Sequence, residues 1–283
     1  AIAQSGGGHH VITTNEAAQA AERLKNSLGV TTLRELRELP AVDILTAQKK
    51  VEEQATEFMT AGQIPFYPSI TKSDLLPNRP IDLFATGVGA KIDLLTGTNA
   101  DETALWGTNN IPEEKLERWF QNYVTDTTPM IEAVKKDRPK ASPGEIAMAL
   151  STDHTFRIPA IRMAESREKH GGKTWMYEFD WKSKAFGGAL GACHALEIPF
   201  VFGTLDAEGA DLFLGTDKTP NALGDIMHHA WTAFIRTGTP TTKAIEDWPL
   251  YQSTARNVLR FADTTGLVKD PWPESRKSWE GIR

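Results

Sequence analysis

LLTGTNADETALW, residues 94–106, runs from an apolar segment through a polar turn into a segment with helical character. The two leucines favour a buried strand, and Gly97 with the polar residues behind it favours a change of direction. Asp101 and Glu102 come directly after the predicted strand. A carboxylate at the carboxyl end of a strand is a standard position for the acid of a catalytic triad, but either residue could equally cap the helix that follows. The spacing favours neither function, and it predicts a strand, a turn and a helix in succession.

Further strand patterns lie elsewhere in the chain, separated by long helical patterns. Residues 174–181, TWMYEFDW, alternate as a strand does, and strands are also predicted over 1–5 and 257–263. The run IPFVFG, residues 198–203, is predicted as a further short strand or extended segment. Helical patterns are predicted over 14–28, 32–58, 112–124, 143–172, 221–238 and 273–282. Strands that alternate with long helices predict an α/β protein.

The boundaries of the first helix are marked by its flanking residues. Thr13 and Glu16 have the spacing of a capping box, and Gly29 is a typical residue to follow the last turn. The proline-rich stretch 62–87 is predicted to be irregular, with short extended pieces.

The composition is that of an ordinary globular chain. Of the 283 residues, 40% are hydrophobic and 24% are charged, and the formal net charge is −6. The length is enough for one large domain or two smaller ones. Lysines and arginines are scattered along the chain, so we expect no nucleic-acid binding. No apolar run reaches the roughly 18–20 residues of a membrane span, so none is expected.

Two features favour a bacterial, cytoplasmic location. Cys193 is the single cysteine, which excludes an internal disulfide framework of the kind that secreted proteins use. The first residues also lack the basic and apolar segments of a signal peptide.

GACHALEIPFVFG, residues 191–203, places a cysteine, a histidine and a glutamate beside an apolar run. A catalytic pair of Cys193 and His194 is disfavoured, because adjacent side chains do not face each other in a strand or in a helix. Cys193 is therefore predicted to be a small buried residue. His194 follows a glycine-rich turn, which is a typical place for a general base, but a lone histidine is also often structural.

Ser5 in AQSGG, residues 3–7, is similar to the serine of a G-x-S-x-G nucleophile elbow. An elbow enters its helix directly, whereas the first helix here is predicted to begin only near residue 14, so Ser5 is disfavoured as a nucleophile. The histidine doublets at 9–10 and 228–229 lack the spacing of metal ligands, and no phosphate-binding glycine motif is present. We therefore expect neither a metal nor a nucleotide.

Five segments taken together resemble the type-B carboxylesterases, the family of bacterial para-nitrobenzyl esterases, mammalian carboxylesterases and cholinesterases. AIAQSG (1–6) resembles the strand after the family's nucleophile helix, and LLTGTNADETALW resembles its acid loop. GACHALEIPFVFG resembles its histidine loop, and AWTAFIRTGTP (230–240) with DWPLY (247–251) resembles its closing helix and Trp-Pro segment. The resemblance implies the C-terminal portion of an α/β-hydrolase fold, with a mostly parallel central sheet flanked by helices.

The resemblance also implies roles for individual residues. Glu102 matches the acid of the triad, although Thr103 stands where the family usually has glycine, and His194 matches the base. Ser5 and Glu197 match a buried serine and glutamate that support the histidine from behind.

The nucleophile itself is not among the matched segments. The family's G-E-S-A-G elbow and glycine-rich oxyanion loop normally precede AIAQSG, and neither is in this sequence. We therefore expect residues 1–283 to be the C-terminal half of a single domain, with the nucleophilic serine in an N-terminal segment.

The implied function is hydrolysis of a small carboxylic ester by a Ser-His-Glu triad, without a metal or organic cofactor and without activity until the N-terminal segment is present. An oligomer is compatible with this function. The alternatives are a catalytically inactive, cholinesterase-like binding or adhesion protein, and an esterase that uses Ser5 as nucleophile. Retention of both Glu102 and His194, and the lack of further cysteines, argue against the adhesion protein. Candidates to line the substrate pocket, or else to fill the core, are Phe66, Trp106, Phe186 and Leu190.

Overall fold

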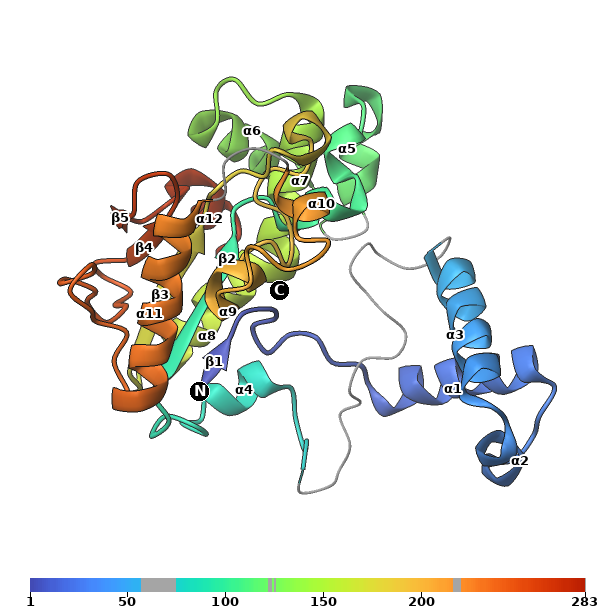
Figure 1. Ribbon diagram of the computed structural model, residues 1–283. Coiled ribbons are helices and arrows are strands. Elements are labelled where there is room, and N and C mark those ends of the chain that lie inside the picture. Colours follow the sequence, from blue (N-terminus) through green and yellow to red (C-terminus); the bar gives the residue numbers. More distant parts are fainter. Residues whose placement is uncertain (57–74, 122–123, 125, 216–219, 283) are drawn as a thin grey trace. The chain divides into compact units, whose positions relative to one another are not determined.

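The computed structural model describes residues 1–56, 75–121, 124, 126–215 and 220–282 (Figure 1). It divides into two compact units. One comprises Ala1–Gly7 with Phe84–Arg283, and the other comprises Gly8–Leu83. The larger unit contains the central sheet and every residue for which a catalytic or supporting role is expected.

The larger unit is built on a five-stranded sheet whose strand order follows the sequence. Its strands are β1 (Ile2–Ala3), β2 (Leu94–Asn99), β3 (Thr174–Phe179), β4 (Asn257–Phe261) and β5 (Gly266–Lys269). β1 to β4 run parallel to one another, and β5 pairs antiparallel with β4. The predicted α/β class with a mostly parallel sheet is therefore confirmed. The first strand is shorter than predicted, and the sequence patterns do not predict β5.

Helical segments occur in both units, and within the larger unit they connect the strands and flank the sheet (Figure 1). In chain order they are α1 (Thr14–Leu28), α2 (Leu33–Glu38), α3 (Ala41–Thr56), α4 (Pro80–Phe84), η1 (Glu102–Trp106), η2 (Thr108–Asn110), α5 (Glu113–Phe120), α6 (Thr128–Asp137), α7 (Pro143–Thr152), η3 (Asp153–Arg157), α8 (Ile158–Glu168), η4 (Ala185–Gly188), α9 (Ile198–Phe202), α10 (Asp211–Leu214), α11 (Asn221–Thr237) and α12 (Pro273–Ser278). η1, η2 and η4 are short 3₁₀ segments, and η3 is a π-helical turn between α7 and α8. The predicted helices over 143–172 and 221–238 are confirmed, whereas the sequence patterns give no prediction for α6.

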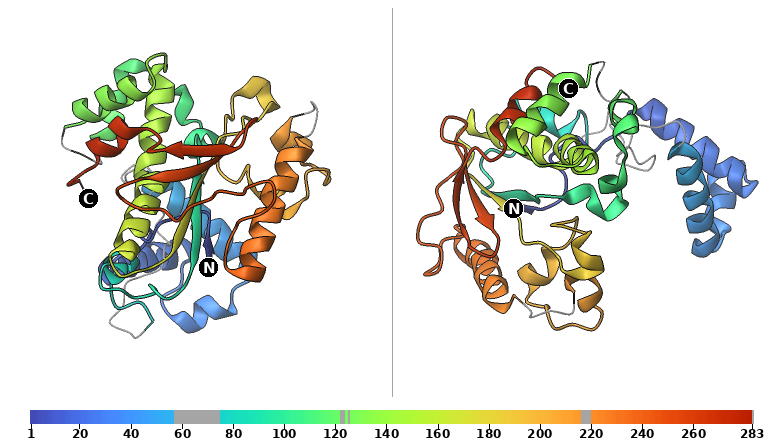
Figure 2. Two further views of the ribbon diagram at one scale, coloured as in Figure 1. Left: turned by 90° about the vertical axis from the view of Figure 1, so that its left-hand side faces the viewer. Right: turned by 90° about the horizontal axis from the view of Figure 1, so that it is seen from above.

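The two faces of the sheet belong to two different hydrophobic cores. Along β3, Trp175, Tyr177 and Phe179 lie in one core, whereas Met176 lies in the other. This alternation is the two-residue period of a strand. α9 and α11 contribute to the first core, and α5 to α8 contribute to the second, so that helices cover both faces (Figure 2). Burial on both faces is expected for parallel strands that are connected by helices.

IPFVFG forms helix α9, so the prediction of a strand or extended segment is wrong. Pro199 lies in the first turn, where its missing N–H is not needed, and Gly203 ends the helix with a φ of 65°. An uninterrupted apolar run carries no period, so its pattern cannot separate a short buried helix from a strand. Phe200 is fully buried and packs against Phe179 and Trp181. These contacts pack α9, the end of the histidine loop, against the sheet.

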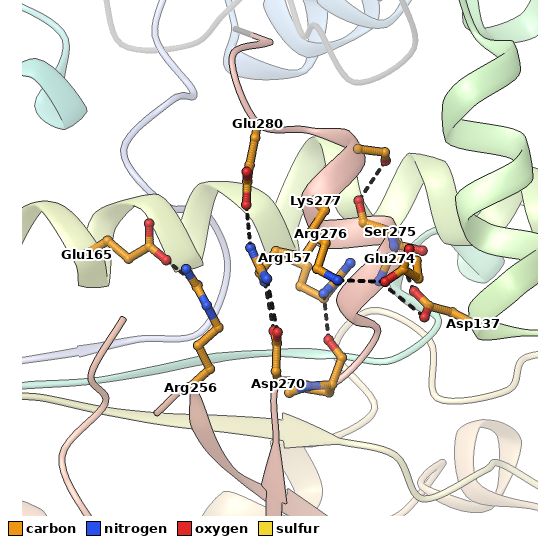
Figure 3. Close-up of polar contacts among 12 residues, drawn as sticks. Asp137, Arg157, Glu165, Arg256, Asp270, Glu274, Ser275, Arg276, Lys277 and Glu280 are labelled. Atoms are coloured by element: carbon orange, nitrogen blue, oxygen red, sulfur yellow. Dashed lines mark hydrogen bonds and ion pairs between the residues drawn. The ribbon is translucent and has the colours of Figure 1, made fainter. Parts of the chain in front are cut away.

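Ion pairs hold the C-terminal segment to the rest of the larger unit (Figure 3). Arg276 of α12 makes two hydrogen bonds to Asp270 and one to Glu280. Arg256, which precedes β4, pairs with Glu165 of α8. The Arg276–Asp270 pair thus joins α12 to the residue that follows β5, and the Arg256–Glu165 pair joins the start of β4 to α8.

The smaller unit contains α1 and α3 packed against each other. The predicted capping box is confirmed, because Thr13 accepts a hydrogen bond from the N–H of Glu16 and the Glu16 carboxylate accepts one from the N–H of Thr13. Gly29 ends α1 with a φ of 68°, as predicted. Of the proline-rich stretch predicted to be irregular, residues 62–74 lie outside the described residues.

Gly97 of β2 lies so close to β3 that no side chain fits. A Cβ at this position would lie 2.3 Å from the carbonyl oxygen of Tyr177 and 2.4 Å from its ring. We expect Gly97→Ala to lower the free energy of unfolding by about 1–3 kcal/mol, because the added volume forces the two strands apart. Denaturant unfolding of the variant measures this change.

Gly266→Ala in β5 is the matched control, because nothing lies within 4 Å of a Cβ at that position. Its unfolding midpoint should stay close to that of the unchanged protein. Equal stability of the two glycine variants would contradict the close packing of β2 on β3.

Candidate active site

Glu102 is held at the carboxyl end of β2 by the turn into η1. Its side chain is only 1% exposed. Oε1 accepts a hydrogen bond from the backbone N–H of Asn99 at 2.8 Å, and Oε2 lies 2.7 Å from Nδ1 of His194. One oxygen is thus fixed by its own strand, and the other is directed at the histidine.

His194 lies in the loop between η4 and α9, and two contacts join it to the acid turn. Its backbone N–H donates to the carbonyl oxygen of Glu102 at 3.0 Å, and its ring binds the Glu102 carboxylate through Nδ1. Ala195 then turns the chain with a positive φ of 66°. The imidazole is 24% exposed, and within the described residues Nε2 has no hydrogen-bond partner. With the proton on Nδ1, the lone pair of the neutral ring is on Nε2, as a general base requires.

The pKa of each partner is raised, but by different effects: burial raises that of Glu102, and pairing raises that of His194. Burial raises the pKa of the Glu102 carboxyl to about 7, although the hydrogen bond and the positive charge of His194 oppose this rise. Burial also lowers the pKa of His194, but its hydrogen bond to Glu102 and the negative charge of that residue outweigh burial. The pKa of His194 therefore lies above its ordinary value. The ring can accept a proton only at a pH above that raised pKa.

Asp101 links the acid turn to the histidine loop instead of capping η1. Its backbone N–H donates to the carbonyl oxygen of Ala192, and its carboxylate accepts from the N–H of Ala192 at 2.9 Å. The same carboxylate pairs with Lys182 and lies 3.8 Å from Arg138. It makes no capping bond to η1. Asp101 and Glu102 therefore both connect the two loops, and neither is a helix cap.

Two aromatic rings pack against the imidazole of His194. The ring centroids of Trp106 and Phe156 lie 5.1 Å and 5.0 Å from that of His194. Phe156 is buried in the π-helical turn η3. Sequence analysis did not single it out, because nothing in the pattern marks this turn. Of the four predicted pocket residues, Trp106 is exposed beside the histidine, Phe186 is exposed, Leu190 packs on the core and Phe66 lies outside the described residues.

The resemblance implies that Ser5 and Glu197 are buried together behind His194, whereas in the described residues the two have different surroundings. Ser5 is exposed, and within the described residues it makes no hydrogen bond with Glu197 or with His194. Glu197, which is 4% exposed, instead accepts hydrogen bonds from Nε2 of Gln4 at 3.1 Å and from Nδ2 of Asn99 at 2.7 Å. Gln4 and Ser5 follow β1 in an irregular segment, in which Gln4 is half-buried and Ser5 is exposed. Gln4 and Asn99 are therefore the residues that bind Glu197, and the sequence analysis assigned no role to either.

Cys193 and the histidine pair at 228–229 make packing and backbone contacts. Cys193 is fully buried, and burial raises the pKa of its thiol to about 12, as suits the predicted packing role. His228 and His229 lie on the exposed side of α11 and bind backbone carbonyl oxygens of Val201 and Asp225.

Within the described ranges no group of three His, Cys, Asp or Glu side chains is placed to hold a metal ion. In the same ranges no helix has the length and apolar character needed to span a bilayer.

Removing the charge of Glu102 tests the electrostatic origin of the raised His194 pKa. We expect Glu102→Gln to lower the pKa of His194, because the imidazolium loses its stabilising charge while burial continues to disfavour it. NMR titration of the His194 ring measures the shift. Glu132→Gln, at an exposed position of α6, is the control and should leave the titration unchanged. An unchanged or higher His194 pKa in Glu102→Gln would contradict the assigned cause.

Comparison with known proteins places the chain in a family. The sequence model of the "Carboxylesterase family" matches residues 1–277. Para-nitrobenzyl esterase of Bacillus subtilis is 31% identical over 98% of this chain and 55% of its own length. Phenmedipham hydrolase of Pseudarthrobacter oxydans is 28% identical over 89% of this chain and 51% of its own length. The chain thus spans about half the length of these relatives.

Solved structures agree with the sequence comparison. A structure of PNB esterase superposes with a TM-score of 0.78 at 30% identity and covers 98% of this chain and 56% of its own. A crystal structure of a Geobacillus stearothermophilus carboxylesterase gives 0.80 at 25% identity, over 98% of this chain and 57% of its own. The expected α/β-hydrolase fold is confirmed, and the chain belongs to the carboxylesterase family.

Proposed function

We propose that this chain supplies the acid and the base of a serine esterase, in which Glu102 orients His194 toward a serine outside these 283 residues. The observation that carries the proposal is the buried 2.7 Å contact between Nδ1 of His194 and Oε2 of Glu102 at the carboxyl end of the sheet. Residues 1–283 are, on this proposal, the C-terminal half of a single α/β-hydrolase domain, and an N-terminal segment completes it.

In the proposed reaction the serine hydroxyl attacks the carbonyl carbon of a small carboxylic ester while Nε2 of His194 takes its proton. Glu102 accepts the hydrogen bond from Nδ1–H, which fixes the tautomer and stabilises the imidazolium. Backbone N–H groups of the completing segment would stabilise the oxyanion, at about 3–4 kcal/mol for each donor. His194 then protonates the leaving alcohol. Water, activated by the same nitrogen, releases the carboxylic acid and restores the serine, and no step requires a metal or an organic cofactor.

Two observations support a nucleophile from outside the chain. Ser5 is exposed and makes no hydrogen bond with His194 among the described residues. The chain also spans only 55% of the Bacillus subtilis para-nitrobenzyl esterase that it matches. Both observations fit a site in which this chain provides the acid and the base, and the rest of the protein provides the nucleophilic serine.

Replacing the proposed acid and base in the full-length protein tests the triad. We expect His194→Ala and Glu102→Gln each to lower kcat/KM for a nitrophenyl ester by roughly 10⁴-fold, because the serine loses its oriented base. His229→Ala, on the exposed side of α11, is the matched control and should retain the full rate. Wild-type rates in both triad variants, or no hydrolysis by the unchanged protein, would contradict the proposal.

The alternative nucleophile has its own test. The 283-residue chain alone is expected to hydrolyse no ester, because two triad members without the serine and the oxyanion donors retain little transition-state stabilisation. Hydrolysis by this chain that disappears in Ser5→Ala would show that Ser5 is the nucleophile instead.

The pKa of His194 sets the acidic limb of the pH profile. The base must be neutral, so kcat/KM of the full-length protein should rise with pH through the His194 pKa and then level off. Because this pKa is raised above 6.5, the pH at which kcat/KM reaches half its maximum should be higher than 6.5. A half-maximal rate clearly below that pH, measured with a nitrophenyl ester, would mean that another group limits the reaction.

A further inference from the structure

We infer that Asn99 is a positioning residue for the base. Its side chain binds the histidine loop at two points, the Cys193 carbonyl and the buried Glu197 carboxylate, while its backbone N–H binds the proposed acid, Glu102. The inference rests on the proposed function, in which His194 acts as the base. Asn99 is the last residue of β2 and is only 1% exposed. It therefore reaches both loops from the rigid sheet.

Three hydrogen bonds of Asn99 converge on the proposed pair. Its backbone N–H donates to Oε1 of Glu102 at 2.8 Å. Its side-chain Nδ2 donates to the carbonyl oxygen of Cys193 at 2.7 Å and to Oε2 of Glu197 at 2.7 Å. The Cys193 carbonyl belongs to the peptide bond that leads into His194. One residue thus fixes both the acid and the backbone that carries the base.

Only an amide meets these contacts. Both side-chain partners of Asn99 are pure acceptors, and the two hydrogens of Nδ2 supply one donor to each. The flipped amide would place Oδ1 against two acceptor oxygens, so the orientation of the group is set by its neighbours. An aspartate has the same shape but no donor, and a leucine has similar volume but no polar atom.

The contacts extend beyond Asn99 into the core. Glu197 also accepts from Nε2 of Gln4 at 3.1 Å, and Oε1 of Gln4 accepts from the indole of Trp231 on α11 at 3.0 Å. Within the described residues Glu197 has no cationic partner, so these neutral amides carry the compensation of its buried charge. A continuous chain of hydrogen bonds therefore runs from Trp231 of α11 through Gln4 and Glu197 to Asn99 at the end of β2.

The charged and titratable groups that face the base come from three elements. Glu102 of η1 and Glu197, which precedes α9, both raise the pKa of His194 against the effect of burial. Tyr177 of β3 is buried beside them, and burial raises the pKa of its hydroxyl well above the ordinary value, so it stays neutral. Asn99 binds both carboxylates, Glu102 through its backbone N–H and Glu197 through its side chain.

Variants at position 99 of the full-length protein test the inference, because they keep the backbone bond to Glu102 and remove only the side-chain bonds. We expect Asn99→Leu and Asn99→Asp to lower kcat for a nitrophenyl ester by about 10²-fold, the effect of a slightly misplaced catalytic group, with KM changed less than about threefold. The downfield proton NMR signal of His194 Nδ1–H should broaden or shift in both variants.

A second substitution separates positioning from a loss of packing. In Asn99→Asp combined with Glu197→Gln, the amide of residue 197 can donate to the carboxylate of residue 99, and the pair again carries one negative charge. We expect kcat to recover at least about fivefold over Asn99→Asp alone, and the Nδ1–H signal to sharpen. The recovery should be incomplete, because the Cys193 carbonyl still lacks its donor.

Asn109→Leu is the matched control. Its Nδ2 also donates to a backbone carbonyl oxygen at 2.7 Å, that of Ala189, but it does not contact the proposed pair. Unchanged kcat and an unchanged Nδ1–H signal in both position-99 variants would overturn the inference, as would the lack of any recovery in the double variant. Failure of the proposed function is distinguishable, because His194→Ala would then retain activity whatever occupies position 99.

Discussion

The hydrogen bond between Glu102 and His194 constrains how the larger unit can fold. An isolated ionised carboxylate in a protein interior costs several kcal/mol, so Glu102 must find partners wherever the chain places it. One partner is the N–H of Asn99, three residues before it, and the other is a ring that lies 92 residues away in sequence. The burial of this one side chain therefore requires that the strand end at Asn99 and that the distant loop return to the same point.

The parallel sheet satisfies that requirement. β2 and β3 are neighbours with Asn99 opposite Phe179, so the chain leaves both strands at the same edge of the sheet. The turn after β2 carries Glu102, the proposed acid, and the segment after β3 leads to His194, the proposed base. This edge is the usual location of ligand and catalytic groups in α/β proteins. Packing of Phe200 on Phe179 anchors the end of the histidine loop, and the close approach of Gly97 to Tyr177 keeps the two strands together. The polar site is thus positioned by apolar contacts beneath it.

Sequence reasoning could find the residues whose signal is local or whose segments resemble a family. Glu102 follows a strand pattern, and His194 lies in a segment that resembles a known histidine loop. The contacts of Glu197 could not be predicted, because they depend on the orientation of the irregular residues that follow the two-residue strand β1. There Gln4 reaches Glu197, whereas Ser5 is exposed. So short a segment has no periodic pattern from which the buried side chain could be read.

The elements that were predicted wrongly or not at all depend on tertiary contacts, which a local sequence pattern does not show. IPFVFG has no period, so only its packing against the sheet makes it a helix. β5 is stabilised by its antiparallel partner and by the ion pairs around α12, both of which are tertiary contacts. The role of Asn99 likewise appears only when strand, acid turn and histidine loop come together.

The central claim is that His194 and Glu102 activate a serine that this chain does not contain. The most direct measurement is mass-spectrometric mapping of the full-length protein after reaction with a fluorophosphonate. We predict a single modified serine outside residues 1–283 and loss of that modification in His194→Ala. Modification of Ser5, or labelling that is independent of His194, would contradict the account.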